Sequence, residues 1–138
     1  MKKRTPIKRS SKNKGKRTPK RRVSRMALRK QADKLFRDAI RERDGWACRN
    51  CGSPVHPQCA HIVSRRYGAV RWCMDNAVCL CKGCHMKFTC DPLGWDDWVD
   101  ERFGSGRLVQ LKLRARQGVA KVDLEGVIAA LEGGTDAD

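Results

Sequence analysis

Long apolar runs are absent from the 138-residue sequence, and none approaches the roughly 20 residues that a membrane-spanning helix needs. The first residues also lack the apolar stretch of a secretory signal. We therefore expect a cytoplasmic protein with no membrane partner. Its length suits one compact domain with tails.

Acidic residues are absent from the first 30 positions, which hold 15 of the 31 lysines and arginines. The other 108 residues hold 16 basic and 15 acidic residues, so +15 of the net charge of +16 lies in those 30 residues. Because the beginning of the chain also has almost no apolar residues, it cannot offset the entropy of ordering. We predict that residues 1–24 form a disordered arm that binds nucleic acid by neutralising phosphates. A solubility tail or a targeting sequence is the alternative.

Large apolar residues are scarce between positions 46 and 90, whereas the chain has eight cysteines. In a reducing cytoplasm these thiols favour metal binding over disulfides. Two pairs with Cys-x2-Cys spacing are separated by 29 residues: Cys48 with Cys51, and Cys81 with Cys84. Two such knuckles supply the four thiolates that Zn²⁺ favours, so we predict a structural zinc site that compensates for the small core. Buried free thiols are the alternative.

Four cysteines remain outside this pattern: Cys59, Cys73, Cys79 and Cys90. Because their spacing is irregular, we expect small buried residues. A second metal site, formed by three of them with His56, is the alternative.

Hydrophobic periodicity predicts an α+β fold. Helices are expected at 25–43, 82–88, 95–103 and 108–116, and from the N-cap Asp123 to 131. Short strands are expected at 58–63 and 76–80, with a loop between them, and Pro92 and Gly94 are expected to break the chain. We divide the chain into the arm, a core domain at 25–92, a helical extension at 93–132 and a frayed acidic tail at 133–138.

Three polar residues stand out within the zinc frame. His61 lies between the knuckles, Asn76 follows it by 15 residues, and His85 directly follows Cys84. Together with the knuckles they make residues 41–89 resemble the HNH nuclease family in its zinc-ribbon form. The run at 60–67, followed by Arg71 and Trp72, looks most like phage recombination-associated nucleases of the NinG type.

The resemblance implies a small ββα-metal (HNH) core, in which two short strands and a helix hold a divalent ion. Flanking helices and the basic arm would surround this core. The resemblance also implies a phage-encoded DNA endonuclease in the host cell cytoplasm, acting in DNA processing or recombination.

Phosphodiester hydrolysis gives these residues distinct roles. A neutral imidazole can take a proton from water near pH 7, so His61 is the expected general base. His85 is the expected ligand of a catalytic divalent cation (Mg²⁺, Mn²⁺, Ni²⁺ or Zn²⁺), which would act as a Lewis acid. The resemblance gives Asn76 the role of a loop clamp that orients the base. Four basic residues are expected to contact DNA phosphates: Arg65, Arg66, Arg71 and Lys87.

One position departs from the family pattern. Many members carry a second metal ligand directly before the base, where this chain has Ala60. Asp75, His56 or Cys59 would have to compensate, or water and substrate phosphate would have to fill the ion's coordination shell.

Two main hypotheses follow: a metal-dependent HNH endonuclease, and a non-catalytic zinc-ribbon module that binds DNA or RNA. A redox or metal-sensing thiol protein is disfavoured by the paired knuckles and the basic arm. A duplex break needs two nicks, and a homodimer is one way to make them.

Overall fold

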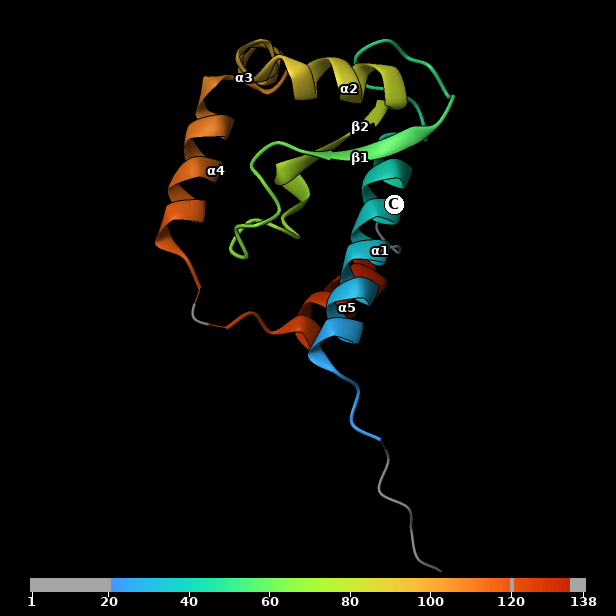
Figure 1. The fold of residues 1–138 in the computed structure, drawn as a ribbon, viewed down its shortest axis with the longest axis vertical. Helices are drawn as coiled ribbons and strands as arrows, with labels where there is room; N and C mark the ends of the chain where they lie inside the picture. The colour runs from blue at the N-terminus through green and yellow to red at the C-terminus, as the bar shows by residue number, and fades with distance from the viewer. Residues whose placement is uncertain (1–20, 120, 135–138) are drawn as a thin grey trace, which may run out of the picture.

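The structure is a computed structural model that describes residues 21–119 and 121–134 (Figure 1). The predictions of a disordered arm at 1–24 and of a frayed tail at 133–138 fall mostly outside these residues. The described residues form an α+β fold with a two-stranded sheet. Its elements are α1 (Arg25–Arg43), β1 (Pro57–His61), η1 (Met74–Asn76), β2 (Ala77–Cys81), α2 (Lys82–Cys90), α3 (Pro92–Phe103), α4 (Ser105–Gln117) and α5 (Leu124–Gly133).

Helix α1 has the bounds that the sequence predicts, because local chemistry marks both of its ends. The Ser24 hydroxyl accepts a hydrogen bond from the Ala27 N–H at 3.2 Å. At the other end the chain leaves the helix through Gly45, whose φ of 70° favours glycine. The helix buries one apolar face, made by Ala32, Phe36 and Ile40.

The C-terminal end of α1 holds the sheet in place. Arg43 donates to the carbonyls of Met74 at 2.6 Å and Ala77 at 2.8 Å. The adjacent Asp44 carboxylate accepts from the Cys79 N–H at 2.8 Å. Strand β2 is thereby fixed to α1 through its backbone.

Strands β1 and β2 pair antiparallel, with a register running from Pro57↔Cys81 to His61↔Ala77. Both predicted strands are confirmed with shifted ends. β1 ends at His61, before the predicted end at 63, because the next residues enter a loop that the Asn76 side chain binds. The first four residues of β2 are buried, since helices pack against both of its faces.

The predicted break between two helices is present but shorter than expected, because α2 ends at Cys90 and Pro92 and Gly94 already lie in the first turn of α3. The Asp91 carboxylate caps this turn by accepting from the Gly94 N–H at 3.0 Å. Proline is favourable at the start of a helix, where its missing N–H has no helical partner to bind. α4 likewise begins at Ser105, three residues before the predicted start.

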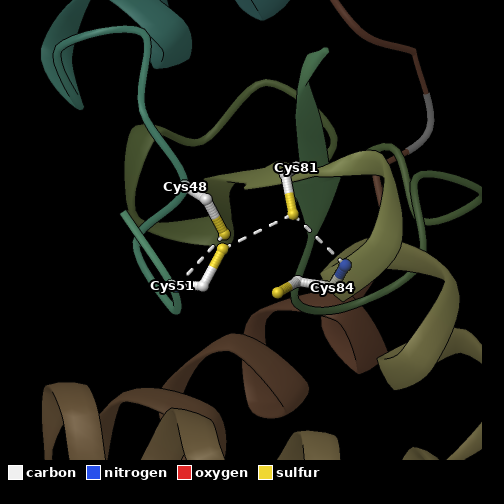
Figure 2. A group of neighbouring side chains, drawn as sticks. All are labelled: Cys48, Cys51, Cys81 and Cys84. Atoms are coloured by element: carbon white, nitrogen blue, oxygen red, sulfur yellow. Dashed lines mark hydrogen bonds between the residues drawn. The ribbon is translucent and has the colours of Figure 1, made fainter. Parts of the chain in front are cut away.

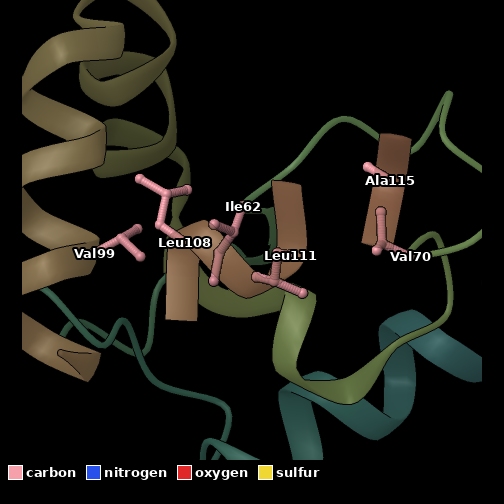
Figure 3. Packing of buried hydrophobic residues seen from close by; sticks show 6 residues of the cluster. All are labelled: Ile62, Val70, Val99, Leu108, Leu111 and Ala115. Atoms are coloured by element: carbon pink, nitrogen blue, oxygen red, sulfur yellow. The ribbon is translucent and has the colours of Figure 1, made fainter. Parts of the chain in front are cut away.

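The C-terminal helices share the core of the sheet. Side chains of α3 and α4 pack against the loop between the strands in one cluster (Figure 3): Ile62, Val70, Val99, Leu108, Leu111 and Ala115. After α4 the chain returns across the molecule, and α5 lies along α1 (Figure 1). None of the described helices combines the length and the apolar composition needed to cross a bilayer.

Candidate metal centre and histidine site

Four cysteine sulfurs meet between the turn after α1 and the start of α2 (Figure 2). The sulfurs of Cys48, Cys51, Cys81 and Cys84 all lie within 4.8 Å of one another, and those of Cys51 and Cys81 are 3.7 Å apart. Tetrahedral bonds of ~2.3 Å from zinc to sulfur would put two thiolates ~3.8 Å apart. The four cysteines are thus placed to hold one metal ion, as predicted.

Each knuckle is shaped by its own backbone. The Cys51 N–H points to the Cys48 sulfur at 3.5 Å, and the Cys84 N–H points to the Cys81 sulfur at 3.4 Å. Gly52 closes the first knuckle with a φ of 76°. These amide groups favour the thiolate form that binds metal.

The four neighbouring sulfurs differ in how readily they lose a proton, as the pKa values of two of these cysteines show. Burial raises the pKa of Cys48, but hydrogen bonds from nearby backbone groups outweigh it and bring the pKa to about 6. The Asn50 amide lowers the pKa of Cys84, but burial and the three neighbouring thiols raise it to about 12. A dication is the group that would let all four thiolates coexist.

A second layer of contacts surrounds these sulfurs. The Asn50 amide nitrogen donates to the Cys84 sulfur at 3.2 Å, and its oxygen accepts from the Trp98 indole N–H at 3.0 Å. Trp98 stacks in turn on Trp95, with centroids 5.3 Å apart. Helix α3 therefore supports the metal centre.

The other cysteines form no second cluster. Within 21–119 and 121–134, the Cys48–Cys84 set is the one group of three or more His, Cys, Asp or Glu residues whose ligand atoms converge. Cys79 is buried and Cys59 and Cys73 are half-buried, but Cys90 is exposed, so the prediction of burial is wrong for Cys90. Burial raises the pKa of Cys59 to about 11, which keeps this thiol protonated.

Asn76 is fully buried at the start of β2 and bridges the loop that follows β1. Its amide oxygen accepts from the Val63 N–H at 2.7 Å. Its amide nitrogen donates to the carbonyls of Val63 at 2.9 Å and Val70 at 3.0 Å. The Asn76 side chain thus makes all of these hydrogen bonds with backbone groups of Val63 and Val70.

His61 ends β1 and is held by two contacts. Its ring stacks on Phe36 of α1, with centroids 5.4 Å apart and 28° between the ring planes. Its Nε2 lies 3.0 Å from the Arg71 carbonyl, and since a carbonyl only accepts, Nε2 carries the hydrogen. Nδ1 is then the nitrogen with the free lone pair. Burial lowers the pKa of His61, which favours this neutral form, although the Arg71 carbonyl opposes the shift in part.

His85 has the opposite tautomer. Its Nδ1 lies 2.8 Å from the amide oxygen of Gln58, so Nδ1 donates and Nε2 keeps the lone pair. Burial lowers the pKa of His85 as well. A histidine whose second nitrogen donates to an oxygen has the arrangement usual for metal ligands.

The two histidines line the same two adjoining hollows. One hollow of about 280 Å³ lies between β1 and the junction of α2 with α3. The other, of about 410 Å³, lies between β1, α2 and α1. Ser64 also lines both hollows. The structure therefore brings His61 and His85 to one shared space, whereas Asn76 lies behind it and shapes the loop.

The residues predicted to bind phosphate differ in position. Arg65 is exposed and lines the larger hollow. Arg66 is exposed beside it, with its guanidinium over the Tyr67 ring at 5.2 Å. Lys87 is exposed over the Phe88 ring at 5.7 Å and lines neither hollow.

Arg71 makes intramolecular contacts that the sequence does not predict. Its guanidinium pairs with the Asp33 carboxylate of α1 at 2.6 Å and donates to the Arg65 carbonyl at 3.2 Å. The Trp72 indole N–H donates to the same carboxylate at 2.9 Å. Burial raises the pKa of Asp33, but the bond from Arg71 outweighs it and holds that pKa below its usual value. The ion pair ties the loop to α1 and engages the Arg71 guanidinium, and the predicted contact of Arg71 with phosphate stays a prediction.

Arg37 is a site residue that sequence reasoning missed. It is exposed on α1 and lines the larger hollow together with His61, His85 and Arg65. No local pattern signals this position, because it depends on α1 packing against the strand that carries His61. Two arginines thus flank the space that the histidines share.

Comparisons with protein-family models, with curated proteins and with solved structures each found no match. A functional proposal therefore rests on the sequence and on the geometry of the site.

Proposed function

We propose that this protein is a metal-dependent endonuclease of the HNH type, with Zn²⁺ in the four-cysteine centre. Strands β1 and β2 with helix α2 would form its ββα core. The substrate would be the phosphodiester backbone of DNA. A phage origin and a role in DNA processing or recombination rest on the sequence resemblance alone.

The observation that carries this proposal is the pairing of His61 with His85 in one hollow. The two rings have complementary hydrogen-bonding states, with a free lone pair on Nδ1 of His61 and on Nε2 of His85. One imidazole can accept a proton from water while the other binds an ion. Two unrelated surface histidines would need neither to line the same hollow nor to be held in fixed tautomers.

His61 is suited to the role of base because its surroundings keep it neutral and fixed. Burial disfavours the imidazolium, and the Phe36 ring and the Arg71 carbonyl set the ring's orientation. Asn76 and the Asp33–Arg71 pair hold the loop that presents this carbonyl. Loss of Asn76 or of the Asp33–Arg71 pair would let the His61 ring change its orientation, although the imidazole itself would still be present.

The arginines and the ion would act on the phosphate. Arg65 and Arg37 have exposed guanidinium groups at the larger hollow, where they can donate to phosphate oxygens. A bound divalent cation would supply Lewis acidity to the phosphate. Among the described residues no third histidine, cysteine or carboxylate converges with His61 and His85. Water and phosphate oxygens would therefore complete the coordination that Ala60 does not provide.

Plasmid cleavage tests the proposal. Zinc-loaded protein should nick supercoiled plasmid when Mg²⁺, Mn²⁺ or Ni²⁺ is added and should leave it intact without an added ion. His61→Ala and His85→Ala should abolish cutting while zinc content and DNA binding stay unchanged. The matched control is His56→Asn at the third histidine, because His56 has a φ of 48° that asparagine tolerates. Cutting that persists in both hollow variants would contradict the proposal.

A non-catalytic zinc module that binds nucleic acid is the second candidate. The observation that favours it is Ala60, a buried methyl group where the resembled family often has a ligand. DNA binding without cutting, under every ion tested, would support this candidate and exclude the first.

A further inference from the structure

A further hollow, of about 380 Å³, lies between the first half of α1, the turn at 66–68, the end of α4 and the segment after α4. Its lining is rich in basic residues and contains no acidic residue among the described positions. Four exposed cationic side chains line it: Arg25, Arg29, Arg66 and Lys121. We call this hollow the basic groove.

The rest of the lining of the basic groove is apolar and partly aromatic. Tyr67 is 39% exposed and Val119 is 53% exposed, and Ala115 and Val122 complete the surface. A methyl group built on Gly68 would lie 3.3 Å from Val122 Cγ2 and 3.4 Å from Val119 Cγ2. The turn and the segment after α4 therefore meet closely at Gly68, which fixes the walls of the groove.

The basic groove and the larger hollow of the histidines are lined by residues of the same two elements, α1 and the turn after β1. On the turn, Arg65 lines the histidine hollow and the next residues, Arg66 and Tyr67, line the groove. On α1, Arg37 lines the histidine hollow and Arg29 lines the basic groove. Eight helical residues span ~12 Å, which is the rise of three to four nucleotides in a B-form strand.

We propose that the basic groove binds a single-stranded segment of DNA that continues the strand lying in the histidine hollow. Positive charge without acidic residues fits a polyanion, since each neutralised phosphate releases counterions. The partly exposed Tyr67 ring, with the Arg66 guanidinium over it and apolar side chains beside it, fits an unpaired base, whose face is free to stack. In a duplex those faces are covered by neighbouring base pairs. The inference rests on the proposed function for the strand's path and deepens it by naming a substrate with a single-stranded extension.

Binding assays without a catalytic ion test this inference separately from cutting. Fluorescence anisotropy of the zinc-loaded full chain would compare a short blunt duplex with the same duplex carrying a single-stranded extension. The variants are Tyr67→Ala, Tyr67→Phe and Arg29→Ala. The matched control is Lys34→Ala, which removes the same charge from the same helix at a side chain that is 73% exposed and lines none of these hollows.

The extended DNA should bind more tightly than the blunt duplex. Tyr67→Ala should weaken binding of the extended DNA by about 5- to 150-fold, the range that base stacking gives, and should change blunt-duplex affinity little. Tyr67→Phe should keep the affinity, Arg29→Ala should lower the salt slope by about 1, and Lys34→Ala should do neither.

If Tyr67→Ala loses the same affinity for both DNAs, or loses none for the extended DNA, the basic groove does not bind a single strand. Arg29→Ala keeps the test decisive if Tyr67→Ala folds poorly, because Arg29 is exposed. A groove that behaves as expected in a protein that cuts nothing would refute the nuclease proposal alone. If the protein cuts DNA with a metal ion but Tyr67→Ala binds the extended DNA as tightly as the unchanged protein, the inference about the groove alone is refuted.

Discussion

Replacing Asn76 with alanine should separate the folding of the loop from the assembly of the metal centre. Asn76→Ala removes three hydrogen bonds of 2.7 to 3.0 Å, made to the backbone of Val63 and Val70. At a net ~1 kcal/mol per bond, the free energy of unfolding should fall by about 3 kcal/mol. The carbonyl of Arg71, which binds His61, belongs to the same loop, so DNA cutting should fall with it.

Urea unfolding at a fixed excess of zinc would measure this loss, and zinc content would check the metal centre. Asn76→Asp is the matched variant, because aspartate has the same shape but cannot donate to the two carbonyls. It should destabilise the protein at least as much as alanine, since it places a carboxylate against those oxygens. A loss below about 0.5 kcal/mol in both variants would refute the clamp, because a single buried hydrogen bond is worth as much.

Four further expectations follow from the same contacts. Gln58→Leu removes the acceptor of the His85 N–H and should reduce cutting by about 10- to 100-fold and raise the ion concentration needed, whereas Gln58→Glu should retain cutting; equal activities would contradict the assigned tautomer. Cys81→Ser should lose zinc and unfold the domain, and an unchanged melting temperature would show that the four-cysteine centre does not stabilise the fold. Because burial lowers the pKa of His61, the neutral base persists to lower pH, and the acid limb of the cutting rate should lie below pH ~6.5; a limb above that value would exclude His61 as a buried base. Deletion of residues 1–22 should weaken DNA binding and flatten its salt dependence, and an unaltered slope would show that the arm contacts no phosphate.

The features that sequence predicts well here depend on local chemistry. The cysteine pairs carry their own turns, and helix α1 carries its cap, its apolar period and its glycine stop. The same reasoning placed both strands to within a few residues. The start of α3 is the local exception, because proline both ends and begins helices, and the Asp91 cap decides between the two.

The features that sequence missed depend on packing between distant positions. The sequence does not reveal the ion pair of Arg71, because its partner Asp33 lies 38 residues away on α1. Arg37 joins the hollow because Phe36 stacks on His61, a contact across 25 residues. The basic groove needs the segment after α4 to return to α1, which no period in the sequence indicates.

Ring signals of the three histidines in a paramagnetic titration test the central claim most directly. Mn²⁺ would be added to zinc-loaded protein bound to DNA with a non-cleavable backbone, and the ¹H–¹⁵N spectrum of the imidazoles would be followed. The expected result is that the ring signals of His61 and His85 broaden together at low Mn²⁺, with His85 affected through Nε2, while His56 stays sharp. Broadening of one ring without the other, or of none, would contradict a single hydrolytic ion between them.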